Sequence, residues 1–401
     1  MLLQPASASA LLRGSGASSK QLTRVIQQQQ SGKVVSHLAL AAKRSFSSTT
    51  GAQSELRKPP HLLSLADLSV PQIASILERS AELKSISRAS DLAFSSSPAA
   101  GKYQGGRILP QSLQGKNVAV IFSKRSTRTR VASETSIASL GGHPLFLSSA
   151  DIQLGVNESL FDTSKVVSSM CDGIMARVGG HEEVELLAKH SRVPVINALS
   201  ARYHPTQILA DLLTMLEDPV IGGTSSASLD TLRGIKVAWI GDSNNILADM
   251  LVAFPRLGIH LSVATPQGDQ YKRDEIVWQD MQDGLKEETS YEKGKVEWGN
   301  DPLAAANNAD IVVTDTWVSM GDESQKTQRL KDFSGFQITE SLLQKAGAKK
   351  SARFMHCLPR KPDEVDDEVF YGPRSIVFEE AENRKWTIMA LFDRMIGEWK
   401  Y

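Results

Sequence analysis

Short apolar runs that alternate with helical segments recur along this chain, and they limit the folds that it can adopt. The first series consists of NVAVIF (117–122), PLFL (144–147), GIMARV (173–178) and PVINAL (194–199). Apolar runs of this length, separated by helix-forming stretches, are typical of buried parallel strands joined by helical crossovers. The pattern predicts a parallel α/β sheet.

A second series starts after the polar segment GGTSSAS (222–228). Its strand candidates are IKVAWIG (235–241), HLSVA (260–264), DIVVT (310–314) and ARFMHC (352–357). Two series in 401 residues predict two domains, each a parallel sheet flanked by helices. Residues 383–401 have the apolar spacing of an amphipathic helix, which we expect to pack back on the first domain.

The segment before the first series predicts a helix and then a loop. Ser69 and Pro71 form a helix start, and apolar residues recur at helical spacing through residues 71–84. Residues 85–106 are rich in Ser, Ala and Gly, so we expect a surface loop there.

The first 54 residues contain Lys and Arg but neither Asp nor Glu, and they are rich in Ser, Ala and Gln. This composition is typical of a mitochondrial transit peptide, and KRSFSS (43–48) has the features of a matrix-protease site. We expect residues 1–46 to be removed and the mature protein to be in the mitochondrial matrix. A merely disordered basic tail is the alternative.

Basic and acidic residues balance over the chain, with 45 of each, so no overall charge would attract nucleic acid or a membrane surface. No apolar run is long enough to span a bilayer. The two cysteines, Cys171 and Cys357, are too few for a disulfide framework or a zinc site. We therefore expect neither a nucleic-acid nor a membrane partner, and any anion site must be local.

The strongest local charge directly follows the first predicted strand, in FSKRSTRTRVASE (122–134). A strand that runs into a helix leaves free backbone N–H groups, here beside the hydroxyls of Ser126, Thr127 and Thr129. The planar guanidinium of Arg128 can bind two phosphate oxygens. The stretch predicts a site for a small phosphorylated molecule, because it lacks the GxxxxGK pattern of a nucleotide-binding loop. A basic helix start that only faces solvent is the alternative.

Other polar residues lie at strand ends or helix starts, where α/β folds collect ligands. Arg177 ends a predicted strand, and His204 shares a helix entrance with Gln207. Each also has an ordinary structural explanation, a surface salt bridge for Arg177 and a core histidine for His204.

The second half offers groups for an amine. WIGDSNNILADM (239–250) has the strand, turn and helix of a dinucleotide-binding unit but not its later glycines, so NAD binding is disfavoured. Asn244 and Asn245 present side-chain amides at a helix start, although an ordinary turn would look similar, and Asp315 could hold a substrate ammonium group. Cys357 ends a predicted strand, where cysteine is usually a core residue, so nucleophilic catalysis is not implied.

Taken together, five motifs make the chain resemble the transcarbamylase family, and within it the mitochondrial ornithine carbamoyltransferases. In chain order they are STRTR (126–130), HPTQ (204–207), DSNN (242–245), DTWVSMG (315–321) and HCLPRKPDEVDDEVF (356–370). The likeness extends from about His61 to Met389. Two places depart from it, because residues 85–106 are longer than the family's connection and the last eleven residues diverge.

The resemblance implies transfer of a carbamoyl group from carbamoyl phosphate to the δ-amino group of L-ornithine, giving L-citrulline and phosphate. This reaction is a step of arginine biosynthesis and of the urea cycle. The resemblance also implies a carbamoyl phosphate-binding domain over residues 55–204 with the C-terminal helix 386–401, and an ornithine-binding domain over residues 205–385. The active unit would be a homotrimer, and no metal or cofactor is expected.

The family's functional residues carry over to the matching positions. Those for carbamoyl phosphate are Ser126, Thr127, Arg128, Thr129, Gln153, Arg177, His204, Gln207, Cys357, Leu358 and Arg384. Those for ornithine are Asn245, Asp315, Ser319 and Met320. The resemblance makes Cys357 and Arg384 catalytic and lets Gln153 reach the neighbouring subunit's site. Either Cys357 or the phosphate would take the proton of the attacking amine.

Two other readings stay open at this point. STRTR and HPTQ would recognise the donor that all transcarbamylases share, so they cannot choose the acceptor, and another amine or amino acid is an alternative to ornithine. A catalytically silent family member that serves as a binding protein is the second alternative.

Overall fold

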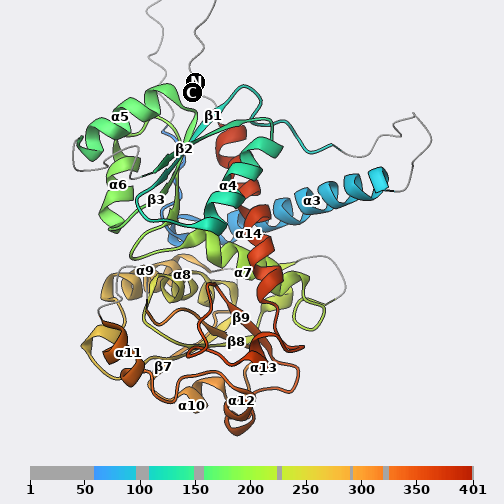
Figure 1. Cartoon of the computed structure of the whole chain (residues 1–401), viewed down its shortest axis with the longest axis vertical. Helices are drawn as coiled ribbons and strands as arrows, with labels where there is room; N and C mark the ends of the chain where they lie inside the picture. Colours follow the sequence, from blue (N-terminus) through green and yellow to red (C-terminus); the bar gives the residue numbers. More distant parts are fainter. Residues whose placement is uncertain are drawn as a thin grey trace, which may run out of the picture. The chain divides into compact units, whose positions relative to one another are not determined.

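The computed structural model describes residues 58–95, 108–148, 158–223, 228–289, 292–318 and 325–399. The expected transit peptide (1–46) lies outside these residues, as do Gln153, Ser319 and Met320. Two parallel sheets organise the described part of the chain (Figure 1), which confirms the predicted fold class.

The first sheet has the strand order β2-β1-β3-β4. Its strands are β1 (Asn117–Phe122), β2 (His143–Ser148), β3 (Gly173–Arg177) and β4 (Val195–Leu199). Its helices are α4 (Thr127–Ser139), α5 (Leu160–Met170), α6 (His181–His190) and α7 (Pro205–Glu217). We call these elements the first lobe. The central strands β1 and β3 are almost wholly buried, as expected of apolar strands covered on both faces, and all four predicted strands are confirmed.

The second sheet has the order β7-β6-β5-β8-β9. Its strands are β5 (Lys236–Ile240), β6 (His260–Ala264), β7 (Val296–Gly299), β8 (Ile311–Thr314) and β9 (Arg353–His356). Its helices are α8 (Asn245–Ala253), α9 (Glu275–Glu287), α10 (Pro302–Ala306), α11 (Lys326–Asp332), α12 (Glu340–Ala346) and α13 (Asp367–Phe370). We call these elements the second lobe. Strand β7 was not predicted, because this edge strand is half-exposed and carries a glutamate among its four residues.

Short turns of 3₁₀ helix lie at Leu65–Asp67, Leu229–Leu232, Pro255–Leu257 and Asp269–Tyr271. Gly258 ends the third of these turns with φ of 80°, a left-handed conformation that glycine adopts without the penalty of a side chain.

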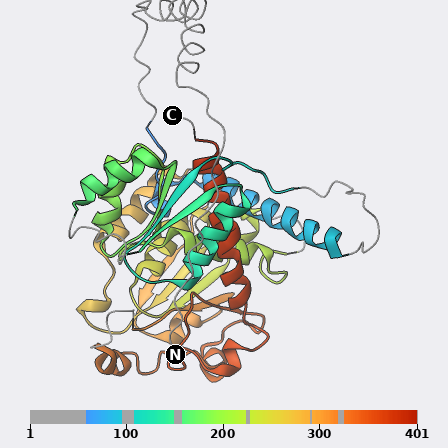
Figure 2. The same cartoon turned by 45° about the horizontal axis from the view of Figure 1, so that its top comes forward.

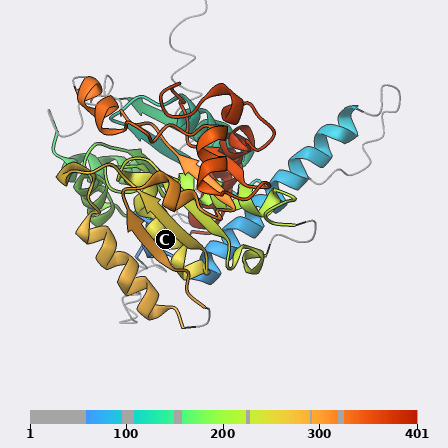
Figure 3. The ribbon, with the colours of Figure 1, turned by 90° about the horizontal axis from the view of Figure 1, so that it is seen from below.

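Helix α3 (Val70–Ser95) is longer than the sequence predicted. The loop expected over residues 85–106 is therefore wrong as far as Ser95. Residues 85–95 contain neither Gly nor Pro, so nothing in them breaks the helix, and Ile86 adds a buried apolar contact. Figure 3 shows the last turns of α3 extending away from the sheets.

The C-terminal helix α14 (Val377–Leu391) begins earlier than predicted and continues into a π-helical segment, Phe392–Gly397. It packs against α3, α4 and α7, which confirms the expected return of the chain to the first lobe (Figure 2). Lys84 anchors it, because its Nζ donates to Asn383 Oδ1 at 2.7 Å and to Glu217 Oε2 at 2.6 Å. Among the described helices, none is both long and apolar enough to cross a membrane.

Candidate active site

The basic stretch of the first lobe meets the second lobe directly. Arg128 Nη2 donates to the carbonyl oxygen of Leu358 at 2.6 Å, so α4 contacts the segment that follows β9. Leu358 has φ of 58°, an unusual conformation for a residue with a side chain, and such positions cluster at ligand sites. The predicted donor-site residues from both lobes thus lie together.

Helix α4 begins as the sequence predicted. Ser126 is its N-cap, and the Ser126 side chain accepts from the backbone N–H of Thr129 at 3.3 Å. The Thr129 hydroxyl is buried and accepts from Arg384 Nη2 at 2.9 Å. This contact joins the start of α4 to the C-terminal helix.

Three arginines converge at this point: Arg128 from α4, which is half-buried, and the buried Arg177 at the end of β3 and Arg384 from α14. Burial and the neighbouring guanidinium groups lower the pKa of Arg177 and of Arg384 to about 10. The Nε atoms of Arg177 and Arg384 are buried and have no hydrogen-bond partner. Cations held this closely with unused donors favour the binding of an anion.

His204 forms the N-cap of α7, and its side chain is buried among the same arginines. Burial, together with Arg384, Arg177 and Arg128, lowers the pKa of the imidazole well below its usual value. The ring is therefore neutral at pH 7, and its Nδ1 lies 3.3 Å from Thr206 Oγ1. A neutral imidazole can donate one hydrogen bond to a ligand without adding a charge.

Gln207 lies in the first turn of α7 and connects Arg384 with two acidic residues. Its Oε1 accepts from Arg384 Nη1 at 2.6 Å. Its Nε2 donates to Asp211 Oδ1 and to Glu380 Oε1, each at 2.8 Å. The predicted residues Arg384 and Gln207 are thus in direct contact.

The acceptor side of the site is formed by residues at the ends of β5 and β8 in the second lobe. Asp315 lies just beyond β8, and burial raises the pKa of its carboxyl group to about 6. Asn244 Nδ2 donates to Asp315 Oδ2 at 3.0 Å, whereas Asn245 Nδ2 donates to the backbone oxygen of Ser200 at 2.7 Å. The structure therefore brings Asn244, rather than Asn245, to the carboxylate.

Glu364 supports the segment around Cys357 and was not found from the sequence. It accepts from His356 Nε2 at 3.1 Å, from the Lys361 N–H at 2.7 Å and from the Trp317 N–H at 3.1 Å. His356 Nδ1 accepts from the Leu358 N–H at 2.8 Å, so the ring proton is on Nε2 and points to Glu364. In the sequence, the run of charged residues that follows HCLPR (356–360) is the signal that could have indicated Glu364.

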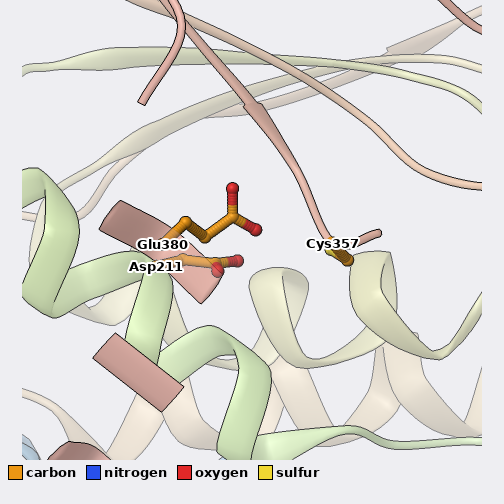
Figure 4. Close-up of side chains that lie close together, drawn as sticks. All are labelled: Asp211, Cys357 and Glu380. Atoms are coloured by element: carbon orange, nitrogen blue, oxygen red, sulfur yellow. The ribbon is translucent and has the colours of Figure 1, made fainter. Parts of the chain in front are cut away.

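Asp211 and Glu380 were also missed. Their carboxyl oxygens and the Cys357 sulfur all lie within 4.8 Å of one another (Figure 4). Burial is the main cause that raises the pKa of Asp211 to about 7 and the pKa values of Glu380 and Cys357 well above their usual ranges. Because Gln207 already donates to both carboxyl groups and guanidinium groups lie nearby, these three side chains are a poor site for a cation.

Comparisons with known proteins agree with this arrangement. The family model for the carbamoyl-P binding domain of aspartate/ornithine carbamoyltransferases matches residues 60–217, and the model for the Asp/Orn binding domain matches residues 233–395. The chain is 49% identical over 340 residues to the mitochondrial ornithine carbamoyltransferase of Schizosaccharomyces pombe, covering 84% of this chain and 94% of that one. It is 50% identical over 295 residues to the mitochondrial ornithine transcarbamylase of Gallus gallus, covering 73% and 78%.

Solved structures give the same result. The mitochondrial ornithine carbamoyltransferase of Coccidioides immitis is 42% identical with a TM-score of 0.71, and the alignment covers 84% of this chain and 98% of that one. The ornithine carbamoyltransferase of Pyrococcus furiosus is 38% identical with a TM-score of 0.72, covering 85% and 98%. By sequence, fold and the residues gathered between its lobes, this chain belongs to the aspartate/ornithine carbamoyltransferase family.

Proposed function

We propose that the protein transfers the carbamoyl group of carbamoyl phosphate to the δ-amino group of L-ornithine, giving L-citrulline and phosphate. One observation carries the proposal: Arg128, Arg177 and Arg384 converge at the junction of the two lobes, where Asp315 approaches from the second lobe. Burial lowers the pKa of Arg128, and the charge of Asp315 acts across this junction in the opposite direction. The cationic side suits a phosphate leaving group, and the carboxylate suits a substrate ammonium group.

The donor would bind at the start of α4. The hydroxyls and backbone N–H groups of Ser126, Thr127 and Thr129 would hold the phosphate together with Arg128. Thr129, Arg177 and His204 would stabilise the charge that develops on the carbonyl oxygen. Gln207, Leu358 and Arg384 would complete the donor site. Because the leaving phosphate is held throughout, the reaction needs alignment and charge stabilisation rather than a covalent intermediate.

The acceptor would bind from the second lobe, to Asp315 with Asn245, Ser319 and Met320. Its amine must be neutral to attack, and an alkyl ammonium has a pKa of about 10.4 in water. The three arginines would favour the neutral amine by repulsion. The donor-binding domain would comprise residues 55–204 with helix 386–401, and the acceptor-binding domain residues 205–385.

The assembly and location follow the family. Several relatives are mitochondrial proteins by name, and this protein would be mitochondrial as well. The matrix would be its compartment after removal of residues 1–46. It would act as a homotrimer in which Gln153 reaches the site of the neighbouring subunit, and it would serve arginine biosynthesis or the urea cycle.

A citrulline assay tests the proposal. The protein starting at Ser47 is given carbamoyl phosphate with ornithine, putrescine or aspartate, and each carbamoylated product is measured. We expect product from ornithine at a rate far above the rates with the other two acceptors. Product only from putrescine or aspartate would assign a different acceptor, and no product from any of them would indicate a silent binding protein.

A further inference from the structure

Two carboxyl groups lie next to the donor site but outside the residues that would contact substrate. Asp211 comes from α7 and Glu380 from α14, and both point toward the end of β9 near Cys357 (Figure 4). We propose that Asp211 and Glu380 share one proton and act as a pair of positioning residues that hold Gln207 and Arg384 toward carbamoyl phosphate. This inference rests on the proposed function.

The first argument is the orientation of the Gln207 amide. Both N–H groups of its Nε2 are used, one by Asp211 Oδ1 and one by Glu380 Oε1. Its Oε1 therefore faces Arg384, from which it accepts at 2.6 Å. Since only the carbonyl oxygen can accept from a guanidinium, the carboxyl pair and the arginine require the same amide orientation. Without the two carboxyl groups, the Gln207 amide would be free to turn, and Arg384 would lose its hydrogen bond to Gln207 Oε1.

The second argument is the missing hydrogen-bond donor. Glu380 accepts at both oxygens, at Oε1 from Gln207 and at Oε2 from the His356 N–H at 2.9 Å. Asp211 accepts at Oδ1, but its buried Oδ2 receives no N–H or hydroxyl donor. A proton between Asp211 and Glu380 would satisfy this oxygen. Two buried carboxyl groups this close cannot both be ionised, so their separation also indicates that one of them carries a proton.

The surrounding charges limit the pair to one proton. Arg384 acts on Asp211 and Arg128 on Glu380, so these guanidinium groups favour one ionised carboxylate, while His204 is neutral. A second negative charge would lie near Asp315, whose carboxylate opposes it. His356 donates its backbone N–H to Glu380 and its ring Nε2–H to Glu364. The pair therefore has one negative charge and one proton at neutral pH.

The sharing is unequal, and this makes it testable. In Asp211→Asn the new Nδ2 can donate permanently where the shared proton lay, while Oδ1 still accepts from Gln207. In Glu380→Gln the amide nitrogen cannot accept, so one of the hydrogen bonds from Gln207 or His356 is lost. Asp211→Ala removes the partner altogether. The exposed neighbour on α14 provides a matched control, Glu379→Gln.

Steady-state kinetics between pH 6 and 9 would test the pair, with the fold of each variant checked by circular dichroism. We expect Glu380→Gln and Asp211→Ala to raise the KM for carbamoyl phosphate about tenfold or more, with a change below about threefold in the KM for ornithine. Asp211→Asn should recover most of the loss of Asp211→Ala. It should also abolish the alkaline decline in kcat/KM for carbamoyl phosphate that ionisation of the pair would cause. Glu379→Gln should match the parent protein.

Any of three results would overturn the inference. The first is an equal rise in the KM for carbamoyl phosphate in Asp211→Asn and Asp211→Ala. The others are an unchanged alkaline decline of kcat/KM in Asp211→Asn, and equal changes in the KM for carbamoyl phosphate and for ornithine. If Glu380→Gln does not fold, the comparison of the two Asp211 variants still decides. Should the parent protein form no citrulline, the proposed function fails on its own. Calorimetric binding of carbamoyl phosphate by the same variants, which should follow the same order, then tests the pair.

Discussion

Asp249 Oδ2 accepts a hydrogen bond from the backbone N–H of His204 at 2.5 Å, across the junction between the lobes. Asp249 lies on α8 of the second lobe, whereas His204 begins α7 of the first. The other carboxyl oxygen of Asp249 accepts from the Leu65 N–H at 2.8 Å. One fully buried carboxyl group thus fixes the start of α7, and with it the donor-site residues His204 and Gln207.

Asp249→Asn should reduce the free energy of unfolding by about 1–3 kcal/mol, because an amide nitrogen cannot accept and one backbone N–H is left buried without a partner. Urea unfolding monitored by tryptophan fluorescence would measure the loss. Asp269→Asn, at an exposed position, is the control and should have the stability of the parent protein. Equal stability of Asp249→Asn and the parent would mean that the Asp249 contacts contribute nothing.

The pH dependence of stability should carry the signature of Asp249. Burial raises the pKa of its carboxyl group to about 8 in the folded protein, above its unfolded value of 3.8. The folded state therefore keeps a proton that the unfolded chain has lost, so this contribution is complete below pH 4 and declines as the pH rises through 8. The stability advantage of the parent protein over Asp249→Asn should shrink between pH 6 and 9. If the stability advantage of the parent protein grew over this range, the pKa of Asp249 would not be raised in the folded state.

Lys84 should be more important for stability than its neighbour Arg88 on the same helix. Lys84→Met keeps the aliphatic stem but removes the ammonium group that joins α3 to Glu217 and Asn383. We expect the free energy of unfolding to fall by about 1–3 kcal/mol. Breaking a fully buried ion pair costs roughly 3–5 kcal/mol, but Glu217 is partly exposed and keeps a hydrogen bond from Asn383. Arg88→Met breaks an exposed pair with Glu382 and should cost less than about 1 kcal/mol. Thermal and urea unfolding of both variants would compare them.

Arg128→Ala should weaken carbamoyl phosphate binding and slow turnover together, because the same guanidinium would meet the phosphate in the ground state and the transition state. We expect kcat/KM for carbamoyl phosphate to fall about 10²–10³-fold, as for removal of a donor to developing charge. Arg130→Ala is a suitable control, since Arg130 pairs with Glu134 on the same exposed helix surface. Unchanged kinetics for Arg128→Ala would refute the phosphate assignment.

The sequence predicted those features that depend on local pattern. The central strands β1 and β3 are continuous apolar runs, and Ser126, Arg177 and His204 lie at strand ends or helix starts, which have their own signatures. The half-exposed edge strand β7 has no such pattern. An acid inside a helix normally faces solvent. Asp211, Asp249 and Glu380 are buried only because α7, α8 and α14 pack together, and one chain without its fold cannot reveal this.

Asp315 should make ornithine binding dependent on pH. Burial raises the pKa of its carboxyl group to about 6, so below this pH the folded protein increasingly lacks the negative charge that would hold the ammonium group. The KM for ornithine should rise about fivefold from pH 6 to pH 5 at saturating carbamoyl phosphate. Asp315→Asn should have a high KM for ornithine throughout and lose this acidic limb. A parallel rise in the KM for carbamoyl phosphate would place Asp315 on the donor side instead.

Two groups could accept the proton of the attacking amine, the Cys357 thiol and the departing phosphate. The thiol is buried, and burial together with Asp315, Glu380 and Asp211 raises its pKa well above the usual value. A thiol that is protonated at neutral pH cannot take the amine's proton, so the departing phosphate is the better acceptor. Cys357→Ser should therefore keep kcat within about tenfold of the parent, whereas loss of a general base typically costs about 10²–10⁴-fold. Profiles of kcat against pH from 6 to 9 would measure this, with Cys171→Ser, outside the site, as the control. A loss of 100-fold or more with a displaced alkaline limb, seen in Cys357→Ser alone, would assign the proton to the thiol.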